Sequence, residues 1–244
     1  MDPKGKVALL TGGARIGQVL AHSLAVRGCD LALLYHRSRE VAEASARAAI
    51  SAGARAVTIH ADATDEDQVA AAVEETHRAL GRIDILLNMA SVYLSTPNPK
   101  EVDWSNMIDA NARSVFLFST YTAPFLKRAP DGARIINFAD WLPASGRPRY
   151  RGFVPYYASK ATVVALTESL ALELAPAVLV NAVAPGPILA PPDLTSEESA
   201  EVVNATPLHR WGGAPEIAKA VLFLVDSDFV TGEIIRVDGG RHLY

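Results

Sequence analysis

Short apolar runs rich in β-branched residues alternate along this chain with longer, alanine-rich runs of helical pattern. That alternation is typical of βαβ units, in which parallel strands form a sheet that helices cover on both faces. The expected strands cover residues 7–10, 30–34, 56–60, 83–87, 134–138, 179–182 and 234–237, and the expected helices cover 16–27, 40–52, 65–80, 104–128, 156–174 and 215–226. Right-handed crossovers then predict an α/β fold with a doubly wound parallel sheet, whose ligands bind at the carboxyl ends of the strands.

The composition predicts a single domain that spans residues 1–244. The chain has 244 residues, of which 50% are hydrophobic, and no linker rich in Gly, Ser or Pro divides it. A formal net charge of −4 provides no basic surface for nucleic acid or for an anionic membrane. No signal peptide, membrane helix or metal-ligand spacing of Cys and His is apparent. We therefore expect a cytoplasmic protein that acts on a small molecule, without a metal.

A glycine-rich turn, TGGARIG, covers residues 11–17 between the first strand and the first helix. Such a turn lets the backbone approach a pyrophosphate, which the N–H groups at the start of the helix attract. Gly12, Arg15 and Ile16 are the candidate contacts. The motif is weak by itself, because turns of this kind also serve simple packing.

The second strand ends in Tyr35-His36-Arg37-Ser38. An NAD site usually places an acid here for the ribose hydroxyls, whereas a 2′-phosphate requires cationic and hydroxyl donors. His36, Arg37 and Ser38 therefore favour NADP(H). The alternative is that Arg37 and Arg39 are solvated turn residues.

Further along, polar and small residues follow the third and fourth strands. Asp62 is placed to accept from an adenine amino group, or alternatively to cap the next helix. Asn88, Met89 and Ala90 end the fourth strand with a surface on which a nucleotide can lie.

The candidate catalytic residues are Tyr156, Lys160 and Asp140. A phenol and an ammonium four residues apart share one helix face, and the positive charge favours the phenolate, so that the tyrosine exchanges protons near neutral pH. Asp140 ends the preceding apolar run, and its negative charge has the opposite effect on the tyrosine.

Taken together, these motifs resemble the short-chain dehydrogenase/reductase family along nearly the whole chain. The matching stretches are the glycine-rich turn, Asp62, residues 88–90, Asn111, residues 137–140, 156–160, 181–186 and 237–240. The resemblance implies a Rossmann fold, hydride transfer from NADP(H), Tyr156 as acid/base, Lys160 tuning Tyr156 and holding the ribose, and Asn111 supporting a water next to Lys160. It also implies a homotetramer and a cofactor site of Gly12, Arg15, Ile16, His36, Arg37, Ser38, Asp62, Ala63, Asn88, Ala90, Ser91, Tyr156, Lys160, Pro185, Gly186 and Ile188.

Within that family, the chain looks most like the pteridine and dihydromonapterin reductases, which carry an acid at the position of Asp140 where most relatives carry Ser. An ionised Asp only accepts hydrogen bonds and would repel the oxyanion of a reduced ketone, whereas a pterin presents N–H donors. The resemblance implies a substrate site of Arg15, Tyr93, Asp140 and Tyr156, with Tyr93 stacked on the pterin ring. Alternatively, Tyr93 is ordinary rim packing and Asp140 marks an inactive protein.

Three segments depart from the family pattern. The glycine-rich turn is one residue short, so Arg15 must serve two positions. The arginine-rich segment 147–152 lengthens the interval between Asp140 and Tyr156, either as a solvated loop or as a site for an anionic substrate tail. Residues 188–203 are acidic and are expected to form a mobile cover over the substrate.

The sequence therefore predicts an NADPH-dependent pteridine reductase. A reductase of 3-oxoacyl thioesters or other carbonyls in the same family is the first alternative. A catalytically silent NADP(H)-binding regulator is the second, although the intact Tyr-Lys pair speaks against it.

Overall fold

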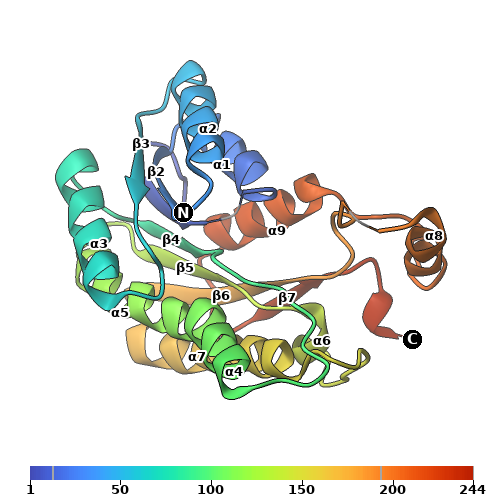
Figure 1. Ribbon diagram of the computed structural model, residues 1–244. Coiled ribbons are helices and arrows are strands. Elements are labelled where there is room, and N and C mark those ends of the chain that lie inside the picture. The colour runs from blue at the N-terminus through green and yellow to red at the C-terminus, as the bar shows by residue number, and fades with distance from the viewer. Residues whose placement is uncertain (13, 193, 244) are drawn as a thin grey trace.

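Seven strands form one parallel sheet in the order β3-β2-β1-β4-β5-β6-β7 (Figure 1). The computed structural model describes residues 1–12, 14–192 and 194–243. The strands are β1 (Val7–Thr11), β2 (Asp30–Tyr35), β3 (Ala56–His60), β4 (Ile85–Asn88), β5 (Ala133–Phe138), β6 (Val178–Pro185) and β7 (Ile234–Val237). This is the predicted doubly wound Rossmann fold. The strand order reverses between β1 and β4, and the carboxyl ends of strands at such a reversal form the ligand crevice.

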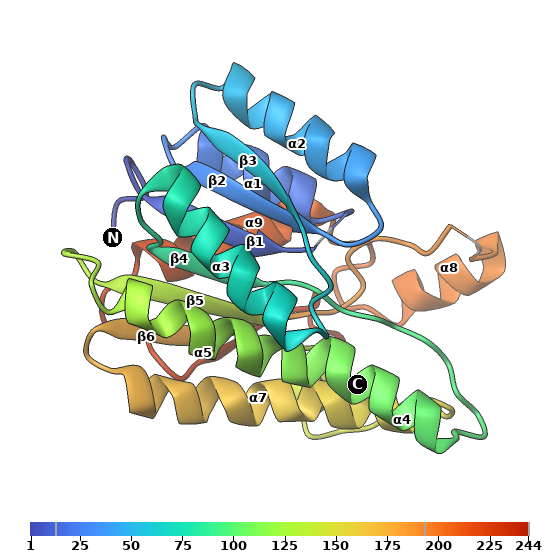
Figure 2. The ribbon, with the colours of Figure 1, turned by 60° about the vertical axis from the view of Figure 1, so that its left-hand side comes forward.

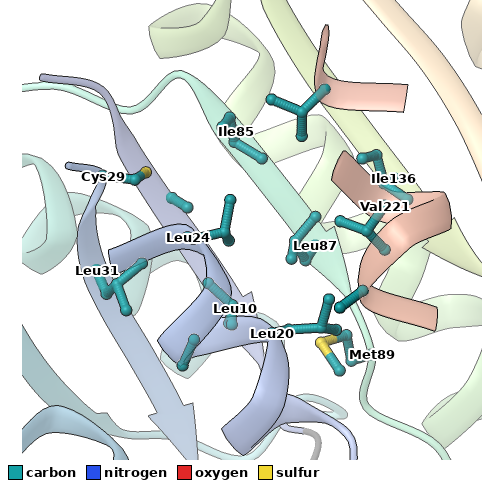
Figure 3. Close-up of a cluster of buried hydrophobic side chains, with 14 of the residues drawn as sticks. Leu10, Leu20, Leu24, Cys29, Leu31, Ile85, Leu87, Met89, Ile136 and Val221 are labelled. Carbon is teal, nitrogen blue, oxygen red and sulfur yellow. The ribbon is translucent and has the colours of Figure 1, made fainter. Parts of the chain in front are cut away.

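Helices cover both faces of the sheet, as the apolar strands require. One face carries α1 (Gly17–Ala25), α2 (Arg39–Ser51) and α9 (Ala214–Asp226), and the other carries α3 (Glu66–Leu80), α5 (Ser114–Leu126) and α7 (Val154–Leu174) (Figures 1 and 2). Each face of the sheet packs against its helices in a hydrophobic core. Successive residues of β1 point to opposite faces, so Leu10 lies in the core beneath α1, α2 and α9, and Leu9 lies in the core beneath α3, α5 and α7. Figure 3 shows Leu10 close to Leu20 and Leu24 of α1, and Val221 of α9 beside Leu87 and Ile136 of the same core.

The prediction of one continuous helix over residues 104–128 is wrong both in its bounds and in its regularity. It is divided into α4 (Glu101–Ile108), a π-helical turn (Asp109–Arg113) and α5. In the turn, the N–H of Ser114 donates to the carbonyl of Asp109, five residues earlier. Turns of this kind often lie at functional sites, and this one carries Asn111.

Three short elements are additional to those predicted: α6 (Trp141–Ala144), α8 (Ser196–Asn204) and a 3₁₀ turn at Arg241–Leu243. Helix α8 occupies the acidic segment that the sequence suggests as a cover, and its mobility stays a prediction. It begins with a capping box, in which Thr195 Oγ1 accepts from the N–H of Glu198 and Glu198 Oε2 accepts from the N–H of Thr195. Within the described part of the chain, every helix is too short or too polar to span a membrane.

Candidate active site

A cavity of about 1270 Å³ lies along the carboxyl ends of the strands, where the fold places a ligand. It is lined by nearly all the predicted site residues: Gly12, Arg15, Ile16, His36, Arg37, Ser38, Asp62, Ala63, Ala90, Ser91, Tyr93, Asp140, Tyr156, Lys160, Pro185, Gly186 and Ile188. Asn88 and Asn111 are not among the lining residues. The fold thus brings together predicted site residues that are up to 176 positions apart, from Gly12 to Ile188.

The glycine-rich turn makes a close backbone approach at Gly12. Its φ is +71°, and a Cβ added there would lie 3.1 Å from the Cα of Ala90, so a larger residue would be strained and crowded. Helix α1 begins directly after the turn, with its free N–H groups at this end of the cavity. Gly13, within the same motif, lies outside the described residues.

The end of β2 places His36, Arg37 and Ser38 on the cavity wall. Arg39, by contrast, belongs to α2 and pairs with Glu43 over 2.7 Å, so the interpretation as a solvated residue holds for Arg39. His36 lies 3.8 Å from Asp62. The wall is therefore cationic and rich in donors, as a 2′-phosphate requires.

Asp62 is held in a local turn, where its Oδ1 accepts from the N–H and the hydroxyl of Thr64. The N–H of Thr64 is the main reason that the pKa of Asp62 is lowered. The alternative role for Asp62, as the cap of the next helix, is wrong, because Asp65 caps α3 by accepting from the N–H of Gln68.

The side chain of Asn88 is turned into the protein interior. Its amide donates to Asn137 Oδ1 over 2.9 Å and to Ser119 Oγ over 3.2 Å. Asn137 donates in turn to Thr167 of α7. The amide of Asn88 therefore connects the ends of two strands, and any contact of this residue with a cofactor stays a prediction.

Asn111 is fully buried and fixes the segment that leads to Tyr93. Its Oδ1 accepts from the N–H of Val92 over 2.6 Å, and its Nδ2 donates to the carbonyl of Val92 and to Ser159 Oγ. The side chain thus joins the loop after β4 to α7. Support of a water by Asn111 stays a prediction.

At the other end of the cavity, Tyr156 donates a hydrogen bond to Asp140 Oδ2 over 2.9 Å. Asp140 Oδ1 accepts from the N–H of Leu142 over 2.8 Å and so caps α6. Lys160 donates to the carbonyl of Phe138 over 2.7 Å. The three predicted catalytic residues therefore share one end of the cleft.

Of the two opposing effects expected on Tyr156, that of Asp140 prevails in this arrangement over that of Lys160. Burial and, second, the charge of Asp140 raise the pKa of Tyr156 well above its usual value. Burial also raises the pKa of Asp140, although the N–H of Leu142 and the phenol of Tyr156 oppose it. Burial lowers the pKa of Lys160 to about 8. The isolated site thus holds Tyr156 protonated, which is the form that can donate a proton.

An aromatic wall, defined here as Tyr93, Tyr150, Phe153 and Tyr156, borders the catalytic end. Tyr93 stacks on Phe153 with the ring centres 4.9 Å apart and meets the Tyr156 ring edge-on at 4.7 Å. The sequence interpretation included Tyr93 but missed Tyr150 and Phe153, because it considered only the arginines of their loop. One signal in the sequence was available for this wall: Phe153 lies only three residues before Tyr156.

The segment that contains α8 covers part of the cavity. The cavity is lined on this side by Leu194, Val202 and Trp211. The indole N–H of Trp211 donates to Ser199 of α8 over 3.1 Å. Arg15 donates to the carbonyl of Ala190 over 2.6 Å and so connects the glycine-rich turn to this cover. Asp193 of the predicted cover lies outside the described residues.

A doubly wound sheet with a long cleft at its switch point, and a Tyr-Lys pair in that cleft, defines a dinucleotide-dependent oxidoreductase as the class of protein. A family model described as "Enoyl-(Acyl carrier protein) reductase" matches residues 13–242. The 3-oxoacyl-[acyl-carrier-protein] reductase FabG of Staphylococcus aureus (strain Mu50) is 37% identical, and the alignment covers 98% of each chain. The 3-oxoacyl-[acyl-carrier-protein] reductase of Synechocystis is 34% identical over 98% of each chain.

Solved structures agree with these relatives. The short-chain dehydrogenase/reductase from Serratia marcescens BCRC 10948 has a TM-score of 0.91 at 32% identity and covers 99% of this chain and 100% of its own. A blue fluorescent protein from a metagenomic library, in complex with NADPH, has a TM-score of 0.90 at 34% identity over 99% of each chain. The chain belongs to the short-chain dehydrogenase/reductase family of oxidoreductases.

Proposed function

We propose that this protein is an NADP(H)-dependent reductase of 3-oxoacyl thioesters or related carbonyl compounds, in which Tyr156 delivers the proton. The observation that carries the proposal is the geometry of Tyr156, which donates to Asp140 one helical turn from the buried Lys160, in a cleft of about 1270 Å³. The names of the most similar curated relatives favour the acyl substrate.

The residues of the cleft fit NADP(H). Gly12 leaves space for a pyrophosphate against the backbone, and His36, Arg37 and Ser38 offer a phosphate three side-chain donors. A bound nicotinamide would supply the hydride. The NADPH complex of one structural neighbour supports the same choice of cofactor.

The protonation state of Asp140 affects how well the site accommodates a carbonyl substrate. An ionised carboxylate repels the negative charge that develops on a carbonyl oxygen, whereas a protonated carboxyl donates a hydrogen bond to it. Burial raises the pKa of Asp140 and so favours the protonated form. The direction of this shift lessens the conflict with a carbonyl substrate, and Tyr156 remains the proposed donor to the carbonyl oxygen.

Reduction of a pteridine is the second candidate, and the aromatic wall together with Asp140 favours it. A flat ring can lie against Tyr93, and an ionised Asp140 can accept from ring N–H or amino groups. The sequence points to this substrate first, but neither curated relative described above is named for it. Its support is the geometry of the aromatic wall and of Asp140.

Turnover of acetoacetyl thioesters and of dihydrobiopterin, followed by NADPH absorbance, separates the candidates. The carbonyl proposal predicts measurable thioester reduction. Asp140→Ser should shift the preference further toward the thioester, because a hydroxyl donates to a carbonyl oxygen whereas an ionised carboxylate only accepts. Reduction of the pterin alone would reject the carbonyl proposal, and NADPH binding without turnover of either substrate would support the silent regulator.

A further inference from the structure

The C-terminal turn reaches the cleft and is held there by hydrogen bonds to one carboxylate. Asp238 is buried just after β7, where its Oδ1 accepts from the N–H of Gly240 and its Oδ2 from the N–H of His242. The ring of His242 also contacts Asp238, at 2.8 Å. The turn that carries Arg241 is therefore fixed by a buried carboxylate (Figure 1, red).

This turn packs directly on the wall of the cleft. A Cβ added to Gly186 would lie 2.7 Å from the Cα of Asp238, so the two backbones are in close contact. Gly186 itself lines the cavity, and so does Arg241. Arg241 thus lines the same cavity as Asp140 and Tyr156.

A second arginine meets the turn from the loop before α7. Nη2 of Arg149 lies 3.5 Å from the carbonyl of His242, and its guanidinium carbon lies 5.6 Å from the centre of the Trp141 ring. Trp141 follows Asp140 and lines the cavity. Arg241 therefore lines the cleft, and Arg149, which is exposed and outside the cavity lining, connects the turn that carries Arg241 to Trp141.

Within residues 1–12, 14–192 and 194–243, neither Arg149 nor Arg241 forms an ion pair, whereas other arginines do. The adjacent acid Asp238 is occupied by backbone N–H groups and His242. Asp140 is occupied by Tyr156 and Leu142.

We propose that Arg241, assisted by Arg149, binds an anionic group of the substrate, a carboxylate or a phosphate, at the edge of the cleft beside Trp141. A guanidinium binds either anion through paired hydrogen bonds, and partial burial limits screening by salt. The inference rests on the proposed reductase function and specifies its substrate: a reducible compound with a negatively charged tail. Arg241 is then a specificity-determining residue.

The test measures binding, so that it does not depend on turnover. Calorimetric titration of the NADP⁺-saturated protein compares acetoacetyl-pantetheine with its 4′-phosphate, and ethyl 3-oxobutanoate with the monoethyl ester of 3-oxopentanedioate. In at least one pair, the charged member should bind at least about tenfold more tightly, as expected for a charge-assisted hydrogen bond. The pair that shows the preference identifies the anion as phosphate or carboxylate.

R241Q should reduce that preference to about twofold or less and leave the affinity for NADP⁺ unchanged, whereas R241K should retain part of it. R151Q is the matched control, because Arg151 is an exposed arginine that, unlike Arg241, does not line the cavity and, unlike Arg149, has no contact with His242 or Trp141 among the described residues. If R241Q fails to fold, R149Q provides the same comparison with a smaller expected loss.

Three results would overturn the inference: equal affinity for both members of both pairs, no binding by any of them, or equal weakening of charged and neutral ligands by R241Q. Charge preference without any NADPH oxidation would leave the inference intact and count against the reductase function instead.

Discussion

Tyr156 donates a hydrogen bond to Asp140 across 2.9 Å, while Lys160, one helical turn further on, donates to the carbonyl of Phe138. The phenolic proton of Tyr156 is therefore directed at the carboxylate of Asp140, and the ammonium of Lys160 is directed at a backbone carbonyl. Because the two acids are in direct contact, they titrate as a pair, and the state of one sets the proton affinity of the other.

Removal of the phenol should abolish most of the activity. In Tyr156→Phe we expect kcat to fall by at least about 100-fold, the usual contribution of a positioned proton donor, while NADPH affinity changes little. Tyr157→Phe is the control, because Tyr157 does not line the cavity. Steady-state kinetics and fluorescence titration measure both quantities, and full activity of Tyr156→Phe with every reduced substrate would contradict the mechanism.

Replacement of the acid should move the alkaline limit of activity. The charge of Asp140 raises the pKa of Tyr156, so in Asp140→Asn that pKa falls and Tyr156 loses its proton at lower pH. Since reduction requires protonated Tyr156, the alkaline limb of the kcat/KM profile should shift to lower pH. A shift in the opposite direction would show that Asp140 does not hold the phenolic proton in the working enzyme.

The choice of cofactor should depend on Arg37. Arg37→Gln removes a charged donor from the cavity wall, and we expect the KM for NADPH to rise by about 10- to 100-fold with little change for NADH. Arg39→Gln is matched in charge and position, but Arg39 pairs with Glu43 outside the cavity, so its KM values should stay near those of the wild type. Equal effects of the two substitutions would reject a phosphate site at the end of β2.

Two glycines beside the cleft should differ in their tolerance of a methyl group. In Gly186→Ala the new Cβ meets the Cα of Asp238 at 2.7 Å, whereas in Gly212→Ala it meets the tip of the Ile188 side chain at 2.9 Å. Backbone cannot yield as a flexible side chain can, so we expect Gly186→Ala to lower the free energy of unfolding by about 3 kcal/mol and Gly212→Ala by about 1 kcal/mol or less. Urea denaturation measures both, and similar losses would show that the Gly186–Asp238 contact relaxes easily.

Most of the fold could be predicted from the sequence, because buried parallel strands require continuous apolar runs and helices repeat with their own period. Residues 134–138, for example, lie within the observed β5. Short elements carry too few residues for a period, so α6 and the turn at Arg241 were missed. The capping box of Thr195 and Glu198 was a readable signal for α8.

The site was predicted less evenly. Residues at strand ends, such as Gly12 and Arg37, could be assigned because every parallel strand delivers its carboxyl end to the same edge of the sheet. Phe153 and Arg241 reach the cleft through loops and turns that fold back on the sheet, and spacing along the chain does not specify such paths.

By itself, the sequence determined the succession of strands and helices along the chain. It also determined that Tyr156 and Lys160 lie on one face of α7, since both properties follow from local periodicity. Only the tertiary structure decided which partners those groups take. Asn88 and Asn111 turn inward, Tyr156 turns to Asp140 and Lys160 to Phe138. The physical reason is that a buried polar group must be satisfied by whatever donor or acceptor the packing brings near it, and that neighbour comes from a distant part of the chain.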